Sequence, residues 1–178
     1  MPRLAPVALA SAQGKSKELL TGVQKKFGMV PNMMATMAQS PAALDGYLAF
    51  SGALAGGTLD ARVREQIALI VGQQNACDYC VAAHTAIGKM VGLADSDILS
   101  ARRASAPSPK VAAILTLASR LVETRGHATE ADLAAARSAG VSDAEIAETV
   151  ANVALNIYTN YFNHVAATTI DFPKPAAL

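Results

Sequence analysis

Three properties of the sequence predict an all-α protein. Apolar residues make up 52% of the chain, but only 4% of residues are aromatic and none is Trp. Much of the apolar content is alanine, whose helix propensity and small side chain favour closely packed helices. Alternating apolar and polar residues, typical of half-buried strands, are scarce, whereas helix start and stop signals recur. A length of 178 residues suits one domain, so we expect residues 1–178 to form a single unit.

In the N-terminal half, proline, glycine and capping residues mark the helix ends. The first residues contain two prolines and are expected to form an extended arm. Ser40 and Pro41 begin a helix as its N-cap and first helical residue, and Asp60 or Thr58 caps the one after it. Asn75 is the expected N-cap of the helix that carries the two cysteines. The predicted helices cover 16–27, 31–39, 41–55, 61–74 and a segment from the cysteines to about 91.

The C-terminal half carries capping boxes, in which two side chains bond each other's backbone N–H groups. Ser142 with Glu145 forms one, and Thr129 with Asp132 resembles another. Glycines follow several of the apolar periodic segments and end them. The predicted helices cover 95–103, 110–125, 130–139, 143–157 and 159–169.

The sequence also contains a weak internal echo. A shift of 83 residues aligns residues 60–87 with residues 143–170, with several identities. The echo predicts a duplicated helical unit, with related halves near 58–91 and 141–171. Both cysteines align with asparagines in the second half, so we expect the chemistry to reside in the first half.

Charge and hydropathy exclude several classes of partner. The chain has 15 basic and 14 acidic residues, a formal net charge of +1, which favours neither nucleic acid nor anionic membranes as partners. No apolar run reaches the roughly 18 residues that a membrane span needs. We expect a cytoplasmic protein. In that compartment a closely spaced cysteine pair is more often catalytic or metal-binding than structural.

The segment GQQNACDYCVAAHTAIGK, residues 72–89, contains the chain's two cysteines, Cys77 and Cys80, together with His84. On a helix these three residues share one face. A helix N-terminus favours a thiolate, and an imidazole one turn after Cys80 can accept the thiol proton. Glu65 can face this imidazole if its own helix packs beside the cysteine helix. These four residues are the candidate catalytic residues.

Other interpretations of these residues stay open. The cysteines could be buried core residues. The same four side chains could bind zinc, although one helix with this spacing gives poor tetrahedral geometry and no second pair of ligands exists. A group of methionines at near-helical spacing is predicted to be core or subunit interface, or a flexible lining for an apolar substrate. These methionines are Met29, Met33, Met34 and Met37.

The run EQIALIVGQQNACDYCVAAH, residues 65–84, resembles the Glu-x11-Cys-x2-Cys-x3-His motif of the AhpD-like alkylhydroperoxidases. These proteins belong to the carboxymuconolactone decarboxylase superfamily. The segments GMVPNMMATMAQSP and TLDARVREQIAL are similar to its longer, peroxidase-related branch, so the resemblance covers most of the chain. It implies an AhpD-like helical bundle with a duplicated helical unit, assembled as a homo-oligomer, commonly a trimer or hexamer.

The resemblance also implies a role for each residue. Cys80 is the peroxidatic cysteine, which attacks a hydroperoxide and becomes a sulfenic acid, and Cys77 resolves it to a disulfide. His84 is the base near Cys80, and Glu65 is the far end of the proton relay. Tyr79 stands where the AhpD type often has histidine, and its phenol is a possible accessory hydrogen-bond donor.

The implied activity is that of a thiol peroxidase, an antioxidant oxidoreductase with no metal or other cofactor of its own. An external dithiol returns the electrons, and a lipoyl-bearing protein is a candidate donor. A carboxymuconolactone decarboxylase-type lyase is one alternative, with Arg62 and Arg64 as the nearest candidate carboxylate-binding residues. A non-enzymatic redox-sensing oligomer is the other. A lyase needs a proton donor and cations rather than two thiols, so the CxxC pair favours the peroxidase.

Overall fold

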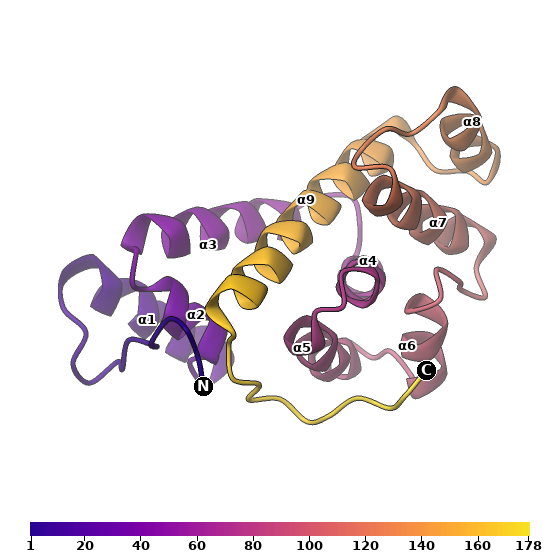
Figure 1. Ribbon diagram of the computed structural model, residues 1–178. Coiled ribbons are helices and arrows are strands. Elements are labelled where there is room, and N and C mark those ends of the chain that lie inside the picture. Colours follow the sequence, from indigo (N-terminus) through magenta and orange to yellow (C-terminus); the bar gives the residue numbers. More distant parts are fainter.

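The computed structural model describes residues 1–178 and contains nine helices and no strands (Figure 1). The prediction of an all-α fold is confirmed. No helix combines the length and apolar character needed to cross a membrane. The helices are α1 (Gly14–Phe27), α2 (Asn32–Met37), α3 (Pro41–Ala55), α4 (Ala61–Gln74), α5 (Asp78–Met90), α6 (Asp95–Ala101), α7 (Pro109–Glu123), α8 (Glu130–Ser138) and α9 (Asp143–Ala166).

The long helix α9 runs through the middle of the molecule (Figure 1). Helices α1–α3 lie on one side of it, and α4–α8 lie on the other. Helix α4 packs against α5, α6, α7 and α9. Because α4 is surrounded in this way, residues 66–72 are all buried, without the polar face of a surface helix.

Two apolar clusters form the core. The larger one joins α4, α7 and α9 through residues such as Ile67, Leu115 and Val153. The second joins α1–α3 to α5, and it contains Leu20 and Leu44 together with both cysteines. The cysteine pair therefore lies in the joint between the N-terminal helices and the rest of the molecule.

Side-chain caps begin several helices where the sequence predicts them. Asp60 accepts a backbone hydrogen bond of 2.9 Å at the start of α4. Both capping boxes are present, Thr129 with Asp132 at α8 and Ser142 with Glu145 at α9. These side chains satisfy N–H groups that a helix leaves free in its first turn.

The start of α5 differs from the prediction. Asn75 ends α4 rather than capping α5, and the N-cap of α5 is Cys77. Between them Ala76 adopts a left-handed backbone with φ of 51°. The N–H of Cys77 bonds the carbonyl of Gly72, which closes the end of α4. Alanine rarely adopts this conformation, so the sequence gives no signal for the turn.

Helix α9 is the second difference. The sequence predicts two helices over 143–157 and 159–169, whereas one continuous helix runs from Asp143 to Ala166. The segment contains no proline or glycine that would stop it. A hairpin of α4 and α5 thus aligns with one straight helix in the second half. The duplicated unit stays a prediction from sequence.

Candidate active site

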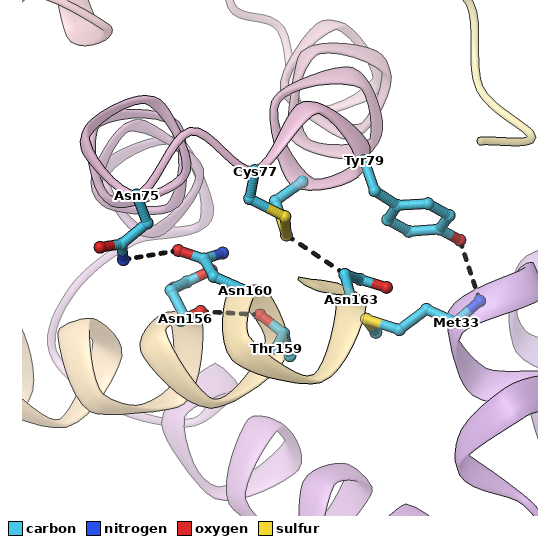
Figure 2. The surroundings of a disulfide bond; sticks show 9 residues. Met33, Asn75, Cys77, Tyr79, Asn156, Thr159, Asn160 and Asn163 are labelled. Carbon is cyan, nitrogen blue, oxygen red and sulfur yellow. Dashed lines mark hydrogen bonds between the residues drawn. A yellow bond between two sulfur atoms is a disulfide. The ribbon is translucent and has the colours of Figure 1, made fainter. Parts of the chain in front are cut away.

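Both cysteines lie at the start of α5 inside the apolar core. Cys77 is the N-cap and Cys80 the third residue of the helix. Their Cα atoms are 5.3 Å apart and their sulfur atoms lie at disulfide distance (Figure 2). Their exposed fractions are only 1% and 2%. The free N–H groups of the helix N-terminus favour the thiolate that forms when such a bond is reduced.

Methionines make up much of the wall around the sulfur atoms. Met33, Met34 and Met37 are buried in the same cluster as the cysteines, which confirms them as core residues. Met29 is 39% exposed. Flexible thioether side chains fill this space without polar groups, so the side of the disulfide toward α2 is apolar.

Helix α9 presents a polar face to the cysteines that the sequence analysis did not identify. The buried polar residues of this face are Thr149, Asn152, Asn156, Thr159, Asn160 and Asn163. The side-chain Nδ2 of Asn163 donates a hydrogen bond to Sγ of Cys80 over 3.3 Å (Figure 2). A hydrogen-bond donor at this sulfur stabilises its anionic form. The signal in the sequence was the 83-residue echo, which aligns Cys80 with Asn163.

The side-chain amides of the α9 asparagines differ in their hydrogen-bond partners. Asn152 and Asn156 donate to carbonyls of their own helix. Asn160 accepts a 2.8 Å hydrogen bond from Asn75, which ties the turn before Cys77 to α9 (Figure 2). Nδ2 of Asn160 and Oδ1 of Asn163 are buried without a partner. One hydrogen-bond donor and one acceptor near the sulfur atoms therefore have no partner.

Glu65 of α4 and His84 of α5 form a pair on the neighbouring turn. Oε2 of Glu65 lies 2.7 Å from Nδ1 of His84, and the side chains are 18% and 20% exposed. A carboxylate accepts hydrogen bonds, so Nδ1 carries the proton and Nε2 of the neutral ring is left as an acceptor. The hydrogen-bond partner of Cys80 is Asn163, and His84 bonds neither sulfur atom in the disulfide state.

Two tyrosines from this region have different environments. Tyr79 points away from the sulfur atoms, and its hydroxyl accepts a 3.1 Å hydrogen bond from the N–H of Met33 (Figure 2). Burial raises the pKa of Tyr79 above its usual range. Tyr79 thus fastens α2 to α5 and does not join Glu65 and His84. Tyr47 of α3 was not predicted: burial, and then the charge of Glu65, raises its pKa to about 12.

The remaining candidates from the sequence lie apart from the cysteines. Arg62 pairs with Asp97 at 3.5 Å on the surface, and Arg64 donates to the carbonyl of Leu59. Neither guanidinium lines the cavities beside α5. No three Cys, His, Asp or Glu side chains are grouped closely enough to hold a metal ion, so the zinc interpretation lacks an assembled ligand set.

Known proteins resemble this chain in the sequence of the motif region and in overall structure. Residues 41–124, from α3 to α7 and including the whole motif, match the carboxymuconolactone decarboxylase family. A peroxidase-related protein from Ralstonia eutropha JMP134 with an alkylhydroperoxidase AhpD core has a similar structure, with a TM-score of 0.86 and 25% identity. The similarity covers 96% of this chain and 92% of that one. Residues 41–124 thus belong to the carboxymuconolactone decarboxylase family, and the whole chain has the AhpD-like fold.

Other structures place the chain within the fold of this superfamily. A peroxidase-related protein from Silicibacter sp. TM1040 has a TM-score of 0.78 at 23% identity, covering 94% of this chain and 92% of that one. The debrominase Bmp8, solved as a cysteine-to-alanine variant with 2,3,4-tribromopyrrole, has a TM-score of 0.81 at 16% identity, covering 95% and 91%. No curated protein sequence matches the chain. This AhpD-like fold is thus shared by proteins of different named activities.

Proposed function

We propose that this AhpD-like protein is a thiol-dependent peroxidase that reduces organic hydroperoxides or hydrogen peroxide through a Cys77–Cys80 disulfide cycle. One observation carries the proposal. The two sulfur atoms lie at disulfide distance at the N-terminus of α5, and Asn163 donates a hydrogen bond to Cys80. The pair of Glu65 and His84, one turn further along, supports it.

In the proposed cycle the Cys80 thiolate attacks the outer oxygen of the hydroperoxide. The O–O bond breaks, Cys80 becomes a sulfenic acid, and the leaving alkoxide takes a proton to become an alcohol. The Cys77 thiolate then attacks the sulfenic sulfur, water leaves and the disulfide forms. A dithiol outside the protein restores both thiols with its two electrons.

His84 is the proposed proton carrier of this cycle. It accepts the proton of Cys80 before the attack and returns it to the alkoxide. Its ring does not contact the sulfur in the disulfide state, so the transfer requires a bridging water or a rotation of the side chain. Glu65 positions the ring through its contact with Nδ1. The apolar methionines keep bulk water from the sulfenic acid and suit an organic hydroperoxide.

The first experiment is stopped-flow oxidation of the reduced protein by cumene hydroperoxide, followed by mass spectrometry of the product. We expect wild type to form the intramolecular disulfide rapidly and Cys80→Ser to abolish the reaction. His84→Ala is expected to slow it about 100-fold, as the loss of a general acid–base does. His127→Ala is the matched control, because His127 lies exposed in the turn after α7.

Thiols that react no faster than free cysteine would contradict the peroxidase. The same assay with 2,3,4-tribromopyrrole tests the activity named for Bmp8, since that enzyme shares the fold. Turnover of a lactone acid that survives both cysteine-to-serine substitutions would support the lyase. Stoichiometric oxidation without turnover under any dithiol would support a redox sensor.

The proposal also covers the protein's localisation, cofactors, partners and assembly. It acts in the cytoplasm with no resident cofactor, with a lipoyl-bearing protein as candidate electron donor, and without nucleic acid or membrane partners. We propose a homo-oligomer, a trimer or hexamer, on the evidence of α9. Its outer face exposes Val150, Tyr158, Tyr161 and Val165, with exposed fractions from 39% to 64%. An apolar strip of this kind on the surface is typical of an interface.

A further inference from the structure

We propose that the electron donor is a small dithiol that carries a carboxylate, and that it enters a cavity on the side of α5 away from His84, where Arg102 binds the carboxylate. The inference rests on the proposed dithiol–disulfide cycle and replaces the lipoyl-bearing protein as candidate donor by a small molecule. It assigns the donor an entrance to the site at Cys77.

The cavity beside α5 has a volume of about 490 Å³ and reaches Cys77 but not Cys80. Its wall on α5 is formed by Asp78, Val81 and Ala82. The helical repeat places Asp78 and Ala82 on the face away from Cys80 and His84, with Val81 at the edge of this face. A molecule in this cavity therefore lies next to Cys77 and away from the imidazole. The volume suits a small molecule rather than a protein chain.

Arg102, just after α6, lies in the wall of this cavity and is only 8% exposed. Its Nε donates to the side-chain oxygen of Gln73 at 2.9 Å, and its Nη1 donates to the backbone carbonyl of Ala176 at 2.6 Å. Both partners are neutral, and no carboxylate pairs with this guanidinium. A buried guanidinium stays charged and is stabilised by an anion.

The other charged residues of the cavity do not neutralise Arg102. Lys174 of the C-terminal segment lines the same cavity and adds a second positive charge. Asp78 of the cavity wall is exposed on the first turn of α5. Arg103, which follows Arg102 in the sequence, is also exposed. A second cavity, of about 540 Å³, adjoins Arg102 and Lys174 on the side of α6. The charge of this region therefore favours an anionic ligand.

The C-terminal segment, residues 172–178, covers the cavity and leads from the end of α9 past α5 to α6 (Figure 1). Its single hydrogen bond to the rest of the protein is the one from Arg102 to Ala176. Phe172 additionally packs edge-on against Tyr79, with ring centres 5.7 Å apart. A carboxylate can replace the carbonyl of Ala176 on Arg102, because a charged acceptor bonds a guanidinium more strongly than a neutral one.

The geometry also gives the direction of the exchange reaction. The donor's thiolate attacks Sγ of Cys77, the S–S bond breaks, and Cys80 leaves as a thiolate that holds the hydrogen bond from Asn163. The donor's second thiol, once deprotonated, attacks its own sulfur in the mixed disulfide and releases the Cys77 thiolate. The donor departs as a disulfide, and its two electrons remain in the two thiols of the protein.

The test measures reduction of the isolated disulfide form without any peroxide. Dihydrolipoate and dihydrolipoamide are the probes, since they share the same dithiol and differ only in a carboxylate or a neutral amide. We expect wild type to be reduced about tenfold faster by dihydrolipoate, the size of a hydrogen bond to a charged group. Arg102→Gln is expected to abolish this preference and to keep the dihydrolipoamide rate within about twofold. Arg102→Lys should retain part of the preference for dihydrolipoate, and the control Arg103→Gln should retain all of it.

Equal rates for the two probes with wild type would overturn the proposal. An equal loss for both probes in Arg102→Gln would also overturn it, because that result indicates a structural role. Octanoate, a carboxylate without thiols, tests the wild-type protein directly. It should slow reduction by both probes, because both reach Cys77 through this cavity, and Arg102→Gln should weaken the inhibition. Wild-type rates that octanoate leaves unchanged would contradict the site. Since no peroxide is used, failure of the peroxidase proposal and failure of this one are distinguishable.

Discussion

At the scale of single residues, the neighbours of a cysteine decide which sulfur leaves and which attacks. Asn163 is 4% exposed and donates its side-chain hydrogen bond to Cys80. Asn156 lies two turns earlier on the same buried face of α9, but it donates to its own helix. These two asparagines therefore separate the effect of the hydrogen bond on sulfur from the effect of a buried amide.

We predict that Asn163→Leu raises the pKa of the Cys80 thiol by about one unit, because the substitution removes a donor from the thiolate at nearly constant volume. The pKa is measured from the pH dependence of alkylation in a Cys77→Ser background. Asn156→Leu, the matched control, should leave this pKa unchanged. An equal shift in both variants would mean that the hydrogen bond does not stabilise the thiolate.

Tyr47 gives a prediction for alkaline stability. Burial, and then the charge of Glu65, raises its pKa from 10.0 to about 12. Because the folded state holds this proton more tightly than the unfolded state, its contribution is fully present below pH 10 and is lost as the pH rises to about 12. We expect Tyr47→Phe to reduce the fall in unfolding free energy across this window by about 1–3 kcal/mol, measured by urea unfolding. A fall in Tyr47→Phe as large as in wild type would contradict this assignment.

At the scale of elements, a carboxylate from α9 holds the start of α4. Glu148 accepts hydrogen bonds from the N–H groups of Thr58 and Leu59, at 2.7 and 2.9 Å. These bonds lower the pKa of Glu148, so their contribution is present above the ordinary carboxyl pKa and is lost as the pH falls. The approach needs a glycine, because a Cβ on Gly57 would lie 2.5 Å from the Glu148 carboxylate.

We therefore predict that Gly57→Ala lowers the free energy of unfolding by about 1–3 kcal/mol, since the carboxylate must leave its two N–H donors. In a Glu148→Ala background the same substitution should be neutral or slightly stabilising, as alanine for glycine is where space allows. A double-mutant cycle by urea unfolding measures the difference. Equal effects in both backgrounds would show that the cost of the substitution does not come from displacing the Glu148 carboxylate.

At the scale of the whole molecule, α9 reverses the usual arrangement of an amphipathic helix. Its buried asparagines and threonines face the cysteines and α4, whereas Val150, Tyr158, Tyr161 and Val165 face outward. A helix with this distribution has a polar buried face matched to the site and an apolar outer face that a monomer leaves in water. The second copy of the chain that we propose would cover this outer face.

We predict that Tyr161→Lys together with Val165→Lys dissociates the proposed oligomer, because two charges would have to be buried at the interface. Light scattering during size-exclusion chromatography should give a multiple of the chain mass for wild type and a single chain mass for the variant. Ala131→Lys, on the exposed surface of α8, is the control and should keep the wild-type mass. A monomeric wild type would contradict the assembly.

The sequence by itself determined most of the helices, their caps at Asp60, Thr129 and Ser142, and the spacing of the cysteine motif. These features depend on periodicity and on contacts within a few residues, which a sequence records directly. It also identified Glu65 and His84 as partners, because a hairpin of adjacent helices brings residues of known spacing together.

Only the tertiary structure decided the rest of the site. The N-cap at Cys77 depends on a left-handed alanine, and the unbroken α9 depends on its packing against four other helices. Asn163 is 83 residues from Cys80, and Arg102 meets a segment more than seventy residues away. Such contacts are set by how the helices pack, and neither propensity nor spacing along the chain encodes which distant side chains will meet.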